Sequence, residues 1–156
     1  MALDKVLKGH DLFAMLPTEQ MHRLSDVSAV KSYRAGEIVF EANQPATHVY
    51  MLMGGEVQLR VAAEQGDVSL VVSNIEKGEL FGLSPLLDSP RYTSGAFCLS
   101  DAELLSIEGE AFRELLRNNC PASFTIMNRV AHIFFHRYID VLKSLQGVAH
   151  QLSLIR

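Results

Sequence analysis

One short stretch in the middle of the chain holds the residues whose types and spacing are best suited to binding chemistry. A strand is predicted to end at Gly82, where a glycine permits close approach to the backbone. The apolar turn over residues 83–87 then offers free N–H groups, which favour an anion. Arg91 follows, beside the hydroxyls of Thr93 and Ser94. Together these groups predict a phosphate cradle, although a loop glycine, a surface arginine and an apolar plug would give the same pattern.

The elements that must position this stretch are predicted from two changes in residue pattern along the chain. We expect one domain, with two short helices in residues 1–28, short strands in 29–108 and further helices in 109–156. The strand region is rich in Val, Ile, Leu and Tyr, is broken repeatedly by glycine, and has no helix between successive strands. This pattern favours an antiparallel sandwich or barrel over a parallel sheet. The strands are predicted at 30–34, 37–41, 48–53, 56–62, 68–75, 92–98 and 102–107.

Two helices are predicted after the strands. The first covers residues 111–117; the second is longer and begins at Pro121, because proline is tolerated in a first helical turn. Gly147 is expected to end or kink the second helix. We expect a homodimer through this helix as far as about Leu145, unless its apolar strip packs on the barrel of its own chain. The strip consists of Ile126, Val130, Ile133 or Phe134, and Val141.

Three motifs, in order, resemble the cyclic nucleotide-binding domain family, which includes bacterial catabolite activator proteins and regulatory subunits of cyclic-nucleotide-dependent kinases. They are residues 33–38, residues 49–57 with their paired glycines, and residues 78–87 followed by Pro90-Arg91. The resemblance implies a mainly β fold with flanking α: an antiparallel β jelly roll with N-terminal helices and a long C-terminal helix. It also implies a ligand-binding cassette that comprises Phe81, Gly82, Leu83, Ser84, Arg91, Tyr92, Thr93 and Ser94.

One position of this cassette departs from the family pattern. The resemblance assigns Arg91 to a cyclic phosphate and makes Gly82 the cassette glycine; the next family residue is a glutamate that accepts a hydrogen bond from the ribose 2′-hydroxyl. Here that residue is Leu83, which cannot accept the bond, and an unpaired buried hydroxyl costs about 1–3 kcal/mol. Ser84 offers only a partial substitute. The departure leaves the expected fold unchanged but weakens the case for cyclic AMP or cyclic GMP as ligand, and no cofactor is expected.

The residues leave three functions open. The first is a regulatory domain that binds a cyclic nucleotide or a similar phosphate-bearing small molecule and passes a helix movement to an effector protein. The second is a ligand-independent interaction module whose cassette no longer binds. The third is a redox or gas sensor with haem or a thiol, although Cys98 and Cys120 are expected to be buried free thiols. We do not expect an enzyme, because no nucleophile–base pair or paired carboxylates stand at catalytic spacing.

Charge and composition limit the partners. A net charge of −4 gives no electrostatic reason to bind DNA or an anionic membrane. No apolar run reaches the length of a membrane span, and no helix-turn-helix pattern follows Leu145, so we expect a cytoplasmic protein without direct DNA or membrane binding. His132 and His136 share a helix face, but no third metal ligand is evident.

Overall fold

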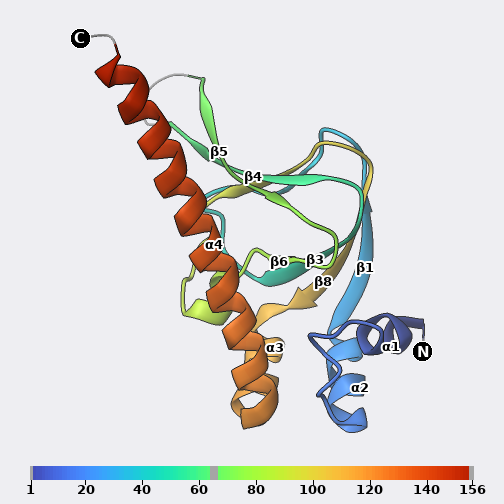
Figure 1. The fold of residues 1–156 in the computed structure, drawn as a ribbon. Helices are drawn as coiled ribbons and strands as arrows, with labels where there is room; N and C mark the ends of the chain where they lie inside the picture. Colours follow the sequence, from blue (N-terminus) through green and yellow to red (C-terminus); the bar gives the residue numbers. More distant parts are fainter. Residues whose placement is uncertain (1, 64–66, 155–156) are drawn as a thin grey trace.

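The computed structural model describes residues 2–63 and 67–154, which form two sheets flanked by helices (Figure 1). The helical elements are α1 (Ala2–Lys8), α2 (Thr18–Asp26), the 3₁₀ helix η1 (Ser84–Leu87), α3 (Gly109–Arg117) and α4 (Cys120–Ser153). The strands are β1 (Ser28–Tyr33), β2 (Ile38–Phe40), β3 (His48–Gly54), β4 (Val57–Ala62), β5 (Ser69–Ile75), β6 (Leu80–Phe81), β7 (Gly95–Cys98) and β8 (Ala102–Glu108). Within the described residues, helices therefore lie at the two ends and η1 alone interrupts the strands, as predicted.

The strands pair antiparallel in two four-stranded sheets. One sheet has the order β1-β8-β3-β6 and the other β2-β7-β4-β5. Strands that are distant in sequence become neighbours, since Leu105 of β8 lies opposite Val30 of β1 and Met51 of β3. This arrangement confirms the antiparallel jelly roll.

The strands β3 and β8 are buried on both faces because their sheet separates two cores. Side chains alternate along a strand. Leu52 and Leu104 therefore face the sandwich core between the sheets, whereas Met51 and Leu105 belong to a helix-facing core. This helix-facing core also collects buried residues from α1, α2, η1, α3 and α4. The cassette borders both cores, since Leu83 belongs to the helix-facing core and Phe81 to the sandwich core.

Gly147 does not end α4, contrary to expectation. The helix runs unbroken to Ser153. No atom lies within 4 Å of the place where a Cβ of Gly147 would be, so the position is open to solvent. The lower helix propensity of glycine, about 1 kcal/mol, is absorbed by the surrounding helical turns.

Two further expectations about local structure are corrected. β7 begins at Gly95 rather than at residue 92, because the backbone of Tyr92 instead bonds the loop at Asn43 and Gln44. Cys98 is buried as expected, whereas Cys120 at the start of α4 is exposed. The turn predicted at residues 65–67 falls largely outside the described residues.

The apolar strip expected along the long helix is divided between two faces. Ile126, Val130 and Ile133 are 0%, 2% and 8% exposed and belong to the helix-facing core. For these three residues, packing within their own chain is the correct alternative. Phe134 and Val141 are 42% and 45% exposed and are available to a partner.

Ile126→Ala tests this placement. The substitution should lower the free energy of unfolding by about 2–5 kcal/mol, because Ile126 is fully buried. Leu99→Ala is the control, because Leu99 is 45% exposed. This substitution should lower the free energy of unfolding by less than about 1 kcal/mol. Urea unfolding followed by circular dichroism gives both values. Equal losses would contradict the assignment of Ile126 to the core.

Candidate functional site

The stretch predicted to bind a ligand is built by β6, η1 and the loop that leads to β7. β6 pairs with β3, with Phe81 opposite Tyr50. Gly82 follows with a φ of 64°, in the left-handed region that glycine adopts without strain, and directs the chain into η1. Asp88 ends η1, also with a positive φ, of 56°. The predicted glycine and short turn are therefore present.

The residues that open η1 face the protein interior. Leu83 is 3% exposed and belongs to the helix-facing core together with Leu86 and Phe112. Ser84 is 8% exposed, and its carbonyl oxygen accepts a hydrogen bond from the N–H of Ser89 at 3.1 Å. The residue at the position of the family glutamate therefore contributes to apolar packing.

Four aromatic side chains, which we call the aromatic cluster, fill the sandwich core beside Gly82. They are Phe40, Tyr50, Phe81 and Tyr92, each at most 6% exposed. The rings of Phe40 and Tyr92 stack with centroids 3.8 Å apart at 17°. A Cβ on Gly82 would lie 3.0 Å from Phe40 and 3.2 Å from Tyr50. The space beside the cassette glycine is thus occupied by the protein's own rings.

Hydrogen bonds to the backbone hold Tyr92 in this cluster. Its hydroxyl donates to the carbonyl oxygen of His48 at 2.6 Å and accepts from the N–H of His48 at 3.1 Å. Its own N–H donates to the carbonyl of Gln44, and its carbonyl accepts from the N–H of Asn43. Burial raises the pKa of Tyr92 and of Tyr50 above the usual tyrosine value, so both phenols are neutral near pH 7.

Arg91 lies at the surface beside this cluster. Its Nη1 donates a hydrogen bond to the carbonyl oxygen of Asn43 at 2.6 Å. Its own carbonyl accepts from the hydroxyl of Ser89 at 2.9 Å. Among the described side chains, no carboxylate forms a salt bridge with Arg91. The guanidinium is therefore held by one loop carbonyl and remains open to solvent.

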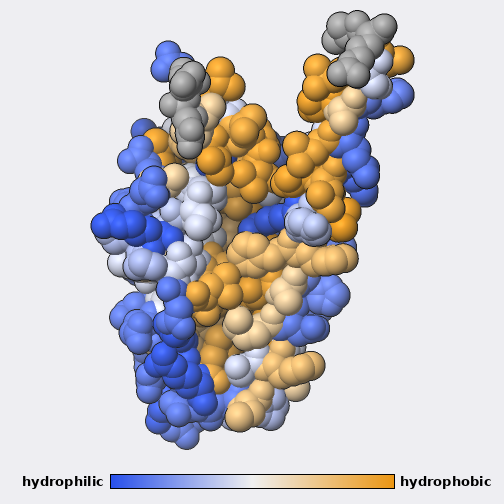
Figure 2. All heavy atoms as spheres, turned by 90° about the vertical axis from the view of Figure 1, so that its left-hand side faces the viewer, coloured by the Kyte–Doolittle hydropathy of each residue, from blue (hydrophilic) through white to orange (hydrophobic). Residues whose placement is uncertain are grey.

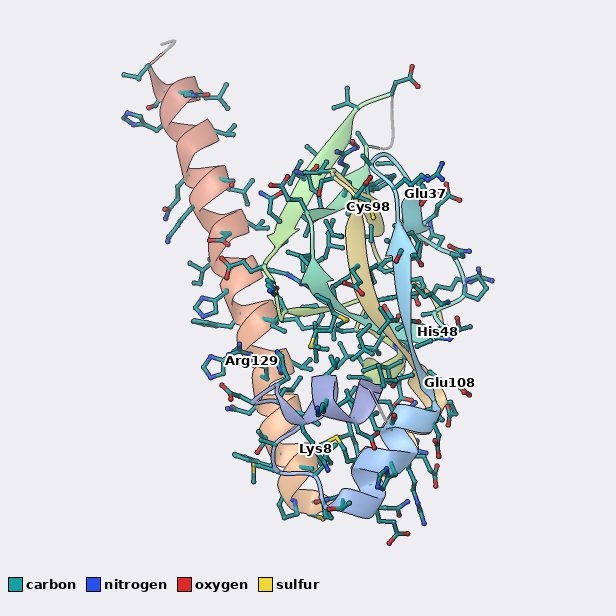
Figure 3. The ribbon with its side chains drawn as sticks, turned by 90° about the vertical axis from the view of Figure 1, so that its right-hand side faces the viewer. Lys8, Glu37, His48, Cys98, Glu108 and Arg129 are labelled. Atoms are coloured by element: carbon teal, nitrogen blue, oxygen red, sulfur yellow. The ribbon has the colours of Figure 1, made fainter. Side chains whose placement is uncertain are left out.

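A groove of about 620 Å³ lies next to the cassette, between the start of β3, the end of η1 and the start of α3. His48 and Glu108 lie opposite each other in the β3–β8 ladder at its edge (Figure 3). Desolvation lowers the pKa of His48, which favours the neutral imidazole. The groove also contains Asp88 and Glu110, and Arg113 is paired with Asp88. Even with Arg113 counted, Asp88, Glu108 and Glu110 leave the groove with a net negative charge, which is unfavourable for a phosphate.

The structure places the predicted cassette residues in two environments. The interior holds Phe81, Gly82, Leu83, Ser84 and Tyr92, whereas Arg91 and Thr93 are exposed and Ser94 is half-buried. Sequence reasoning missed Phe40 and Tyr50, which close the space beside Gly82. Their only signal was an inward position in predicted strands, a signal that ordinary core residues share.

Two wider features bear on other functions. Among the residues that the structure describes, no three His, Cys, Asp or Glu side chains are arranged to hold a metal ion. The rings of His132 and His136 lie 6.3 Å apart on α4. None of the described helices combines the length and apolar character needed to cross a bilayer.

The jelly roll, the glycine turn into η1 and the long helix α4 together form a β-roll domain. Residues 30–119, more than half of the chain, match the model of the cyclic nucleotide-binding domain family. The chain belongs to this family, and it is a regulatory domain of that type.

Individual relatives agree with this assignment. The chain is 27% identical over 111 residues to the cyclic AMP receptor protein of Thermus thermophilus, an alignment that covers 71% of this chain and 51% of that protein. A candidate cyclic nucleotide-binding protein of Geobacter metallireducens has a similar structure, with a TM-score of 0.74, 28% identity and coverage of 88% of this chain and 99% of the other. The sensor domain of the transcriptional regulator DNR of Pseudomonas aeruginosa shares the fold, with a TM-score of 0.73, 21% identity and coverage of 87% and 96%.

Gly82→Ala tests whether the aromatic cluster closes on the cassette. Gly82 and Gly36 both have positive φ, 64° and 85°, so alanine incurs backbone strain of about 1–2 kcal/mol at either position. At Gly36 the added Cβ meets nothing within 4 Å, whereas at Gly82 it presses on Phe40 and Tyr50. Gly82→Ala should therefore cost about 1–3 kcal/mol more than Gly36→Ala. Equal losses in urea unfolding would show that the rings do not close on Gly82.

Proposed function

We propose that this chain is a regulatory domain closed to cyclic nucleotides, which acts through contacts of α4 with a second copy and with an effector protein. The observation that carries this proposal is the stacking of the Phe40 and Tyr92 rings, whose centroids lie 3.8 Å apart. The Phe40 ring also packs closely against Gly82. A nucleotide seated at Gly82 would have to separate these rings. Aromatic pairing contributes about 0.5–1.5 kcal/mol beyond the buried area, and that free energy would oppose binding.

The position next to Gly82 supports the same proposal. Leu83 offers no acceptor to a ribose hydroxyl, and its side chain is 3% exposed within the helix-facing core. A ligand would therefore lose a hydrogen bond worth about 1–3 kcal/mol when left unmade. Leucine at this position instead contributes to the stability of the empty domain.

Arg91 supports a second candidate function, the sensing of a phosphate-bearing small molecule. The guanidinium is exposed and has one carbonyl partner, Asn43, so little is lost when it turns to an anion. The Thermus relative is named for cyclic AMP, and the present chain spans about half of its length. In this candidate function, Arg91, Thr93 and Ser94 would bind the phosphate after the cluster opens.

A thiol sensor receives less support from the structure. Cys98 is 2% exposed, and burial together with the charge of Glu37 raises the pKa of its thiol. Both residues lie toward the same end of the sandwich (Figure 3). A buried thiol with a raised pKa forms little thiolate, which is the reactive species.

Calorimetric titration with cyclic AMP and cyclic GMP separates the first two functions. The closed domain should give no binding heat at millimolar nucleotide. If the wild type binds a nucleotide and Arg91→Ala weakens that binding at least about tenfold, the sensor function is established instead. This loss is expected because a charge-assisted hydrogen bond contributes about 1.5–3 kcal/mol. Arg117→Ala is the matched control, since Arg117 is an exposed arginine of α3. Equal binding by all three proteins would exclude the cassette as the site.

The proposed homodimer rests on a heptad pattern along α4. Apolar residues recur at alternating steps of four and three, the spacing of a two-stranded coiled coil. They are Met127, Ala131, Phe134, Tyr138, Val141, Leu145, Val148 and Leu152. From Phe134 onward each of them is 42–62% exposed. This strip, which we call the heptad strip, lies beside the face that holds the buried Ile126, Val130 and Ile133, and Met127 at its start packs against the helix-facing core.

The surface next to the heptad strip is also apolar. Val68, Leu70 and Val71, at the start of the β5 region, are 63%, 62% and 55% exposed. Figure 2 shows apolar side chains on both α4 and the neighbouring strands of this face. Exposed apolar surface that continues over neighbouring elements is typical of interaction sites, which supports the proposal. A second α4, paired along the heptad strip, would cover much of it.

Leu145→Glu tests the homodimer. A charge in the middle of the heptad strip should convert a dimer into a monomer, because it would be buried without a partner. Gln146→Glu is the control, since it adds the same charge at the next, exposed position of α4. Sedimentation equilibrium of the three proteins measures the association. A wild type that stays monomeric at high micromolar concentration would contradict the dimer.

A further inference from the structure

Among the described residues, Arg137 makes the last side-chain hydrogen bond from α4 to another segment of the domain. The buried residues of α4 are Ala122, Ile126, Val130 and Ile133. Arg137 lies one turn beyond Ile133, and its side chain is 12% exposed. After it, the described residues of the helix are exposed, apart from the half-buried Ile139. From this point the helix continues along the β5 side of the sandwich with most of its side chains exposed (Figure 1).

The partner of Arg137 is fixed in place. The Nη2 of Arg137 donates to Oε1 of Glu79 at 3.2 Å, and the Glu79 side chain is 22% exposed. The second carboxylate oxygen of Glu79 accepts from the N–H of Glu76 at 3.0 Å. One carboxylate thus closes a turn and binds α4 at the same time.

This turn leads directly into the cassette. The N–H of Gly78 donates to the carbonyl of Leu52 in β3 at 2.7 Å. Nε2 of His10, from the segment after α1, lies 2.9 Å from the carbonyl oxygen of Gly78. Residues 80–81 then form β6, and Gly82 follows. Glu79 is thus joined to the cassette glycine through the two residues of β6.

Arg137 also reaches the heptad strip. Its guanidinium carbon lies 5.8 Å from the centre of the Phe134 ring, within the range of a cation–π contact. Phe134 is 42% exposed and is a member of the strip. The pair is incompletely satisfied, since Nε of Arg137 is buried without a hydrogen-bond partner. An unsatisfied buried donor carries a free-energy cost, so the Arg137–Glu79 contact is not an ideal one.

We infer that Arg137 is a positioning residue that couples the turn of Glu79, and with it the cassette, to the orientation of α4 and of its heptad strip. The inference rests on the proposed function, because it takes α4 as the element through which the domain contacts its partners. The ion pair itself lies within one chain, so the coupling exists whether or not the chain dimerises.

Glu79→Gln is the most selective test. Glutamine keeps an oxygen for the N–H of Glu76 but removes the charge that binds Arg137. Hydrogen-exchange mass spectrometry of the full chain should show amide exchange at least about tenfold faster in residues 126–137 of α4 and in residues 76–82 together. Glu19→Gln is the control, because it breaks the exposed Glu19–Arg23 pair of α2.

A second variant makes the result decisive. Arg137→Met keeps the apolar stem and should accelerate the same two segments, and the double variant should exchange no faster than the single ones, because both remove one contact. Unchanged exchange in α4 in Glu79→Gln, or additive effects in the double variant, would overturn the inference. Sedimentation of Glu79→Gln should also show at least about threefold weaker dimerisation, although residue 79 lies outside the heptad strip. A monomeric wild type would refute the proposed dimer, while the exchange result would still decide the role of Arg137.

Discussion

The ring of Phe40 contacts both the cassette glycine and Tyr92, and the packing of the sandwich interior beside the cassette depends on these contacts. Its centroid is 3.8 Å from that of Tyr92, and an added Cβ on Gly82 would lie 3.0 Å from its edge. Tyr92 is in turn held by the backbone of His48 at the start of β3. The contact therefore ties β2, β3, β6 and the loop before β7 into one unit. A glycine that permits a ligand to approach the backbone here permits the protein's own rings to do so.

The two cores explain how a family fold persists while its site changes. β3 and β8 contribute alternate side chains to the sandwich core and to the helix-facing core, so the framework is specified by burial on both sides of one sheet. The cassette lies at the junction, where Leu83 enters one core and Tyr92 the other. Leu83, at the position of the family glutamate, adds apolar packing to the helix-facing core. Fold and ligand binding are thus separable properties of the same residues.

Much of the fold could be predicted from the sequence because its signals are local. Glycine breaks and β-rich runs marked the strands, and the proline near the start of α4 marked the long helix. The expected interruption at Gly147 was wrong, because one exposed glycine does not overcome a helix that continues on both sides. The predicted strip through Ile126 mixed two faces, since a helical apolar pattern does not say which side the domain covers.

The site was less predictable because its contacts are long-range. The cassette residues lie together in the sequence, whereas Phe40 and Tyr50 reach them only through the crossovers of the jelly roll. The same holds for Arg137, which meets Glu79 across 58 positions of the chain. Spacing identifies residues that share a turn or a helix face. It does not identify an aromatic ring, such as that of Phe40, that reaches the cassette from the other sheet.

A crystal structure determined in the presence of millimolar cyclic AMP tests the closed cassette most directly. The account predicts that Phe40 remains stacked on Tyr92, that Arg91 keeps its hydrogen bond to the carbonyl of Asn43, and that no nucleotide density lies beside Gly82. Nucleotide density at Gly82, with the ring of Phe40 displaced and the guanidinium of Arg91 on the phosphate, would contradict it.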